Sequence, residues 1–175
     1  ALVMDGAVDR ATHGFHTYPA RMHPDAAAAI IDACPGHVHD PFCGGGTVLV
    51  EALLAGRSST GTDASPIAVL VSQARTADKA MATPMRSAAR KITEAARLRV
   101  DVEVPDVAQR WYQPHVAQEL GRIRDGILDA DPVVQPLLSA LLSSIIIKTS
   151  FRKSDTQNRR ETHHRAPGTT AILFH

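Results

Sequence analysis

The residues best suited to chemistry form a glycine-rich segment, Asp40-Pro41-Phe42-Cys43-Gly44-Gly45-Gly46-Thr47. Glycine lets a backbone approach a ligand closely because it has no Cβ. The amides of such a loop, together with the start of a following helix, offer hydrogen-bond donors. Asp63 follows at about the spacing, roughly 20 residues, at which an acid after a second strand binds ribose hydroxyls. The pattern predicts a site for a nucleotide-like ligand.

The elements around this loop are expected to hold it between two short strands. Residues 37–39 predict a strand before the loop, and residues 47–55 predict a buried helix after it. Residues 59–62 predict a second strand that ends at Asp63. Strand, glycine-rich loop, helix, strand and acid is the order found in the first half of a nucleotide-binding α/β unit.

The segment resembles amino-group DNA methyltransferases and their RNA-modifying relatives, whose first motif reads Asp-Pro-Phe-Cys-Gly-Ser-Gly-Thr. Here Gly45 stands in place of the serine. The resemblance continues through residues 48–52, 56–57 and 61–68, and upstream it includes residues 16–24, so it covers roughly residues 13–76.

The resemblance implies a partial Rossmann-like α/β methyltransferase fold with a largely helical insertion. It also implies S-adenosylmethionine as the cofactor and transfer of its methyl group to an exocyclic amino group of adenine or cytosine in DNA. RNA stays open as the alternative substrate. Phe42 has a second interpretation, as a core residue. The cofactor-binding residues implied in this way are Tyr18, Pro19, Asp40, Pro41, Phe42, Cys43, Gly44, Gly46, Thr47, Asp63, Ala64 and Ser65.

The sequence departs from the family at the catalytic motif, which in the family is Asp, Asn or Ser followed by two prolines and an aromatic residue. The chain contains no Pro-Pro pair, so the catalytic residues stay unassigned. We expect a chain cut before its catalytic motif, with a permuted enzyme that lost its front half as the alternative. A second hypothesis is a non-catalytic subunit that binds cofactor or nucleic acid and whose partner supplies the catalytic loop.

A third, weaker hypothesis is a nucleotide-dependent oxidoreductase, which the glycine-rich loop and Asp63 alone would allow. The spaced three-glycine pattern of dinucleotide-binding enzymes is absent, which disfavours that activity.

The second half of the chain has the patterns of helices. Val116, Leu120, Ile123 and Ile127 recur at helical spacing, which predicts one apolar stripe over residues 114–130. Another helix, rich in leucine and isoleucine, is expected after residues 131–132. Residues 148–165 follow with six Lys and Arg against two acids, which predicts either a solvated loop or a phosphate-binding segment. The candidate nucleic-acid contacts are Arg152, Lys153, Arg159 and Arg160.

The predicted division has a cofactor-binding part at 1–80, a helical insertion at 81–147 and a basic loop or tail at 148–175 that leads towards a missing catalytic part. Composition is 44% hydrophobic and 21% charged with a net charge of +1, which is typical of globular proteins. The two cysteines suit neither a disulfide framework nor a zinc motif. We expect a cytoplasmic protein without a membrane span.

A metal site is not expected, although the chain has nine histidines. None of them is flanked by Cys or Asp at ligand spacing. His37 and His39 share one face of a strand that should be buried, where they would be core histidines. Cys43 is interpreted as a packing residue. Trp111 and Tyr112, just before the striped helix, are interpreted as core aromatics, with stacking on a base as the alternative.

Overall fold

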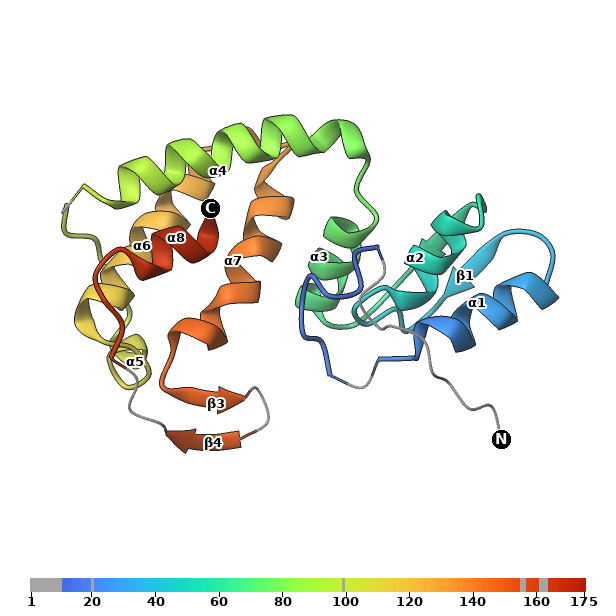
Figure 1. The fold of residues 1–175 in the computed structure, drawn as a ribbon, viewed down its shortest axis with the longest axis horizontal. Coiled ribbons are helices and arrows are strands. Elements are labelled where there is room, and N and C mark those ends of the chain that lie inside the picture. The colour runs from blue at the N-terminus through green and yellow to red at the C-terminus, as the bar shows by residue number, and fades with distance from the viewer. Residues whose placement is uncertain (1–10, 20, 99, 155–156, 161–163) are drawn as a thin grey trace. The chain divides into compact units, whose positions relative to one another are not determined.

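The computed structural model describes residues 11–19, 21–98, 100–154, 157–160 and 164–175. The chain divides into two compact units, Ala1–Asp78 and Lys79–His175 (Figure 1). We call them the N-terminal unit and the helical unit. Each is described by itself below.

The described residues of the N-terminal unit form two short strands and three helices. The strands pair in parallel, with Val38 opposite Ser59 and Asp40 opposite Gly61. The helices α1 and α2 pack against each other, and α2 also contacts both strands. In chain order the elements are α1 (Pro24–Ala33), β1 (Val38–Asp40), α2 (Thr47–Leu54), β2 (Ser59–Gly61) and α3 (Pro66–Arg75).

Side chains fix both ends of α1. Pro24 occupies its first turn, where no backbone donor is needed, and the His23 side chain accepts a hydrogen bond from the Asp25 amide. At the other end the guanidinium of Arg57 donates to the carbonyl of Ile31 at 2.6 Å. The same guanidinium also donates to two carbonyls beyond the helix. Arg57 therefore joins the end of α1 to the segment before β2.

The predicted Rossmann-like α/β fold is wrong. The described residues are mostly helical, and the parallel sheet that they form has only two strands of three residues each. Two strands this short cannot form the extended twisted sheet that defines the predicted fold. The predicted order from strand to acid is present, but residues 79–149 continue with helices where a larger parallel sheet would need further strands.

The expected burial of His37 and His39 is also wrong, because both side chains are exposed. Each ring hydrogen-bonds to the hydroxyl of Thr60 on the neighbouring strand at 3.0 Å. The sheet therefore presents a polar face, and the two histidines are surface residues.

The helical unit is built around α4, α6 and α7, with α8 packed against all three (Figure 1). The shorter elements η1 and α5 precede α4 and α6. A two-stranded hairpin follows α7, where the sequence predicts a loop or tail. In chain order the elements are η1 (Lys79–Met81), α4 (Ala82–Ala96), α5 (Asp106–Gln109), α6 (Pro114–Leu128), α7 (Gln135–Thr149), β3 (Arg152–Ser154), β4 (Gln157–Arg160) and α8 (Thr169–Phe174).

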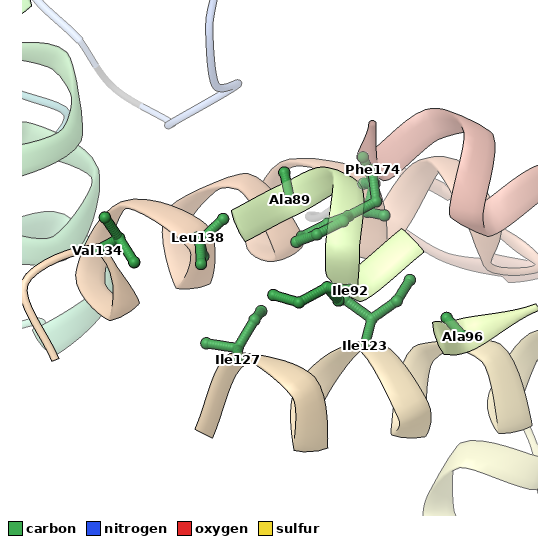
Figure 2. Packing of buried hydrophobic residues seen from close by; sticks show 9 residues of the cluster. Ala89, Ile92, Ala96, Ile123, Ile127, Val134, Leu138 and Phe174 are labelled. Carbon is green, nitrogen blue, oxygen red and sulfur yellow. The ribbon is translucent and has the colours of Figure 1, made fainter. Parts of the chain in front are cut away.

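The core of the helical unit lies where α4, α6, α7 and α8 converge (Figure 2). Ile123, Leu138 and Phe174 are completely buried there. The predicted stripe on α6 is confirmed, since Val116, Ile123 and Ile127 are buried and Leu120 packs against the same cluster. Burial of these side chains is the main favourable term for this unit.

We predict that Ile123→Ala lowers the free energy of unfolding by about 2–5 kcal/mol, because it leaves a cavity in the packed core. The matched control is Ile172→Ala, since Ile172 is 64% exposed and its replacement should cost less than about 0.5 kcal/mol. Urea denaturation of both variants measures the difference. Equal destabilisation by the two substitutions would show that the core is misassigned.

Candidate ligand-binding site

The glycine-rich loop follows β1 and is joined by backbone hydrogen bonds to Thr62, the residue after β2. The Thr62 amide donates to the carbonyl of Asp40, and the Cys43 amide donates to the carbonyl of Thr62, both at 2.9 Å. Within the loop, the Gly46 amide donates to the carbonyl of Cys43 at 2.7 Å. The first two bonds continue the pairing of the strands beyond their ends. The third closes the turn that precedes α2.

Two of the glycines are required by their surroundings. Gly46 has φ +79°, a left-handed conformation that side chains rarely adopt, and a Cβ there would lie 2.8 Å from the Cβ of Ser72. A Cβ at Gly45 would lie 3.0 Å from both the Cβ of Tyr18 and Nη1 of Arg75. The loop is therefore confined between α3 and the segment that carries Tyr18.

Asp63 closes the loop from the side of β2. One carboxylate oxygen accepts from the Gly44 amide at 2.9 Å, and the other accepts from the Ser65 amide at 2.8 Å. The hydrogen bond from Ser65, followed by that from Gly44, lowers the pKa of the Asp63 carboxyl below its usual range. Each oxygen retains acceptor capacity for a further donor.

Arg75, at the end of α3, ties the loop to the N-terminal segment. Its side chain is only 2% exposed, and its guanidinium donates to the carbonyls of Gly45 at 2.6 Å, His16 at 2.6 Å and His13 at 3.0 Å. Burial, and to a smaller extent the charge of Arg21, lowers the pKa of this guanidinium. One buried cation thus joins three segments that are distant in sequence.

A second buried contact holds the same N-terminal segment on α2. The imidazole Nε2 of His13 lies 2.7 Å from the carboxylate of Glu51, and both side chains are buried. Arg21 also donates to the His13 carbonyl at 2.8 Å. Residues 12–18 are therefore fixed across the glycine-rich loop.

A cavity of about 310 Å³ lies beside the loop. Its size is at the lower end of the range for small-molecule sites. Phe42 lies at the cavity with 84% of its surface exposed, so its interpretation as a core residue is wrong. The lining residues are Tyr18, Arg21, Met22, Asp40, Phe42, Cys43, Gly44, Gly45, Thr47 and Val48.

The start of α2 contributes polar groups to this cavity, in addition to the side chains of Tyr18, Arg21 and Asp40. Gly46 precedes the helix and gives no side-chain cap, so the first-turn amides lack the acceptor that such a cap would supply. The hydroxyl of Thr47 is buried and has no hydrogen-bond partner within the described part of the chain. Helix N-termini of this kind favour an anionic ligand group.

The cavity brings together half of the residues that the resemblance implies as cofactor-binding, and adds others. It is also lined by Arg21, Met22 and Val48, which are not among the residues implied as cofactor-binding, and by Gly45 of the predicted glycine-rich segment. The supporting contacts from Arg75 and the His13–Glu51 pair have no local sequence signal, since their partners lie 30 to 62 residues away. Predicted residues outside the lining are Pro19, Pro41, Gly46, Asp63, Ala64 and Ser65.

Cys43 has the environment of a packing residue. Its side chain is 6% exposed, and its sulfur lies 3.8 Å from the hydroxyl of Ser72. Burial is the largest cause of the raised pKa of the Cys43 thiol, whereas a nucleophilic cysteine needs a lowered pKa.

The predicted nucleic-acid contacts belong to the helical unit. Arg152 begins β3, and its guanidinium carbon lies 5.3 Å from the centre of the Trp111 ring. Lys153 continues β3, whereas Arg159 and Arg160 end β4. The side chains of these last three lie outside the described residues.

Two negative findings apply to the described residues alone. The described residues include no group of three or more His, Cys, Asp or Glu side chains that could bind a metal ion. They also include no helix with the length and apolar character needed to cross a membrane.

Comparison with known proteins finds similarity to a methyltransferase over part of the chain. The Type II methyltransferase M.MvaI of Kocuria varians is 39% identical over 71 residues, a match that covers 37% of this chain. The chain spans only 16% of the length of that relative. No family model matches the chain, and no solved structure matches it. The similarity supports a relationship with a methyltransferase.

We predict that Arg75→Met releases the N-terminal segment from the loop, because three carbonyls are deprived of a charged donor. The free energy of unfolding should fall by about 2 kcal/mol or more. Hydrogen exchange should also accelerate at the amides of residues 13–18. The control is Gln73→Met, which changes an exposed side chain of the same helix. Unchanged exchange in Arg75→Met would contradict the assigned role.

Asp63 should contribute stability that depends on pH. Its folded pKa is lowered, so the contribution is complete above the ordinary carboxyl value of about 3.9 and is lost as pH falls through the lower folded value. We therefore expect the stability difference between the wild type and Asp63→Asn to shrink as pH is lowered below about 3.9. Denaturation at a series of pH values between neutral and strongly acidic measures it. A difference independent of pH would refute this assignment.

Proposed function

We propose that the chain binds S-adenosylmethionine and serves methyl transfer to an exocyclic amino group of adenine or cytosine in DNA. The observation that carries the proposal is the buried Thr47 hydroxyl, which lines the cavity and lacks a partner among the described residues. Similarity to a Type II methyltransferase supports the cofactor class. RNA is the alternative substrate.

The donor set at the cavity suits the carboxylate end of this cofactor. The Thr47 hydroxyl and the uncapped amides of α2 can donate to a carboxylate. The Asp63 carboxylate, whose oxygens retain acceptor capacity, can accept from ribose hydroxyls while it holds the Gly44 amide. Tyr18 lies against Gly44 and Gly45 of the loop and also lines the cavity. The bound cofactor supplies an electrophilic methyl group on a sulfonium.

A non-catalytic subunit is the second candidate function. It is favoured by the sequence itself, which contains no Pro-Pro pair and therefore lacks the family's catalytic motif. In that case the N-terminal unit would bind the cofactor and another polypeptide would contact the target amine. Activity measured on this chain alone would then be absent even though the cofactor binds.

We predict that Thr47→Val weakens the binding of S-adenosylmethionine about tenfold or more, because it removes a hydrogen bond to a charged group. The folded state should be no less stable, since the removed hydroxyl is unpaired. Calorimetric titration measures the affinity, and thermal unfolding measures the stability. Thr60→Val, on the exposed face of the sheet, is the control and should bind as the wild type does.

Three results would count against the proposal. The first is a folded wild-type chain that shows no saturable binding. The second is a Thr47→Val variant with wild-type affinity. The third is displacement of the cofactor by low concentrations of a nicotinamide dinucleotide, which would favour the oxidoreductase hypothesis.

A further inference from the structure

The helical unit has a cavity of its own, beside α4, α6 and α8, which contact one another in pairs. We call it the α8 cavity. Its volume is about 740 Å³, well within the range of small-molecule sites. All of its lining residues belong to the helical unit. Apolar side chains form part of the wall, namely Ala96, Pro114, Pro167, Ala171 and Ile172.

A buried carboxylate without an ion-pair partner lies in this wall. Glu119, on α6, is 6% exposed. One of its oxygens accepts from the Gly168 amide at 2.6 Å, and the other accepts from the Thr170 amide at 3.2 Å. Its charge has no salt-bridge partner in the part of the chain that the structure describes.

The two amide contacts of Glu119 fix the start of α8, but they use only about half of the acceptor sites of the carboxylate. Acidic side chains are almost never fully buried unless they are paired. The α8 cavity therefore favours a ligand group that is cationic and donates hydrogen bonds, such as an ammonium.

A guanidinium with an unused nitrogen lies one turn further along α6. Arg122 donates through Nε to the carbonyl of Val100 at 2.6 Å and through Nη1 to the carbonyl of Ala96 at 3.2 Å. Its Nη2 has no hydrogen-bond partner among the described residues. Residues three apart share a helix face, and both Glu119 and Arg122 line the cavity. The two carbonyl contacts orient the guanidinium, so an anionic ligand group costs it little further entropy.

The charges around the α8 cavity are balanced. Its other two ionised side chains, Arg97 and Asp101, are exposed. With Glu119 and Arg122 they give two positive and two negative groups, which cancel when His115 is neutral. Electrostatic complementarity therefore disfavours a polyanion and a polycation, and it favours a ligand with one charge of each sign.

We propose that the α8 cavity binds a free α-amino acid with a large apolar side chain. The ammonium group of the ligand binds Glu119, and its carboxylate binds Nη2 of Arg122 and the guanidinium of Arg97. The ligand side chain packs against Ala171 and Ile172. The proposal goes beyond the proposed function and does not rest on it, because the lining lies wholly within the helical unit.

The test is calorimetric titration of the full chain with L-phenylalanine and L-leucine. Phenethylamine, which lacks the carboxylate, and 3-phenylpropanoate, which lacks the ammonium, are titrated beside phenylalanine. We expect saturable binding of an amino acid, and each analogue should bind about tenfold or more weakly than phenylalanine because it loses a hydrogen bond between charged groups. Methionine is avoided, since it is a part of S-adenosylmethionine and could enter the cavity of the N-terminal unit.

Glu119→Gln should weaken the binding of phenylalanine about tenfold or more. The matched control is Glu103→Gln, the same change at an exposed residue outside the lining. Circular dichroism verifies that each variant is folded, because Glu119→Gln also alters the contacts at the start of α8.

Arg97→Met tests the carboxylate contact independently, at an exposed residue whose replacement should not disturb folding. It should weaken the binding of phenylalanine about threefold. The affinity for phenethylamine, which has no carboxylate, should not fall, and a merely structural effect would lower both affinities. Arg110→Met, another exposed arginine outside the lining, is the control.

The proposal is overturned if neither amino acid binds to the folded chain, or if Glu119→Gln and Glu103→Gln bind phenylalanine equally. Displacement of phenylalanine by equal concentrations of spermidine or inorganic phosphate would also overturn it, because either would indicate a site for a single sign of charge. So would a loss of phenylalanine binding in Thr47→Val, which would place the ligand in the N-terminal unit.

Titration with S-adenosylmethionine separates the two proposals. A chain that binds this cofactor but no amino acid refutes the assignment of the α8 cavity alone. A chain that binds phenylalanine in a manner sensitive to Glu119→Gln, but does not bind the cofactor, refutes the proposed function alone.

Discussion

The geometry of the ligand site depends on a buried cation that donates to backbone carbonyls. Arg75 lies at the end of α3 and donates to carbonyls of the glycine-rich loop and of the segment before α1. Burying a charge is costly unless hydrogen bonds compensate for the water removed. The loop and the segment must therefore both be in place for the charge to be accommodated. The cavity beside Thr47 is lined by residues from both of these parts of the chain.

The same requirement gives the site its pre-formed character. Asp63 fixes one side of the loop through the Gly44 amide, and the His13–Glu51 contact fixes the covering segment on α2. Polar groups that are already oriented lose little entropy when a ligand binds. The donors at the start of α2 are therefore held in place by contacts within the N-terminal unit.

Local signals in the sequence are sufficient for the loop, for the short strands and for the apolar stripe of α6. Gly46 and Pro24 mark a turn and a helix start through their own backbone preferences. The predicted fold class is wrong because a strand–loop–helix–strand order does not determine how many strands complete a sheet. Arg75 cannot be identified from sequence as a site residue, because its acceptors are backbone carbonyls, which carry no residue-type signal. The strands β3 and β4 escape prediction because their sequences lack the alternating apolar pattern of a half-buried sheet.

The backbone amides of Phe151 and Arg165, on either side of β3 and β4, donate to Trp111 and Gln113 just before α6. This anchoring has an evolutionary consequence. Both ends of the excursion are fastened to the same short stretch of chain, while the core of the helical unit is made by other residues. Lengthening a surface loop changes its closure entropy only slightly. The segment between these two anchors can therefore differ in length and sequence between related proteins without repacking of the helices. Substitutions in this segment therefore leave the helical scaffold unchanged.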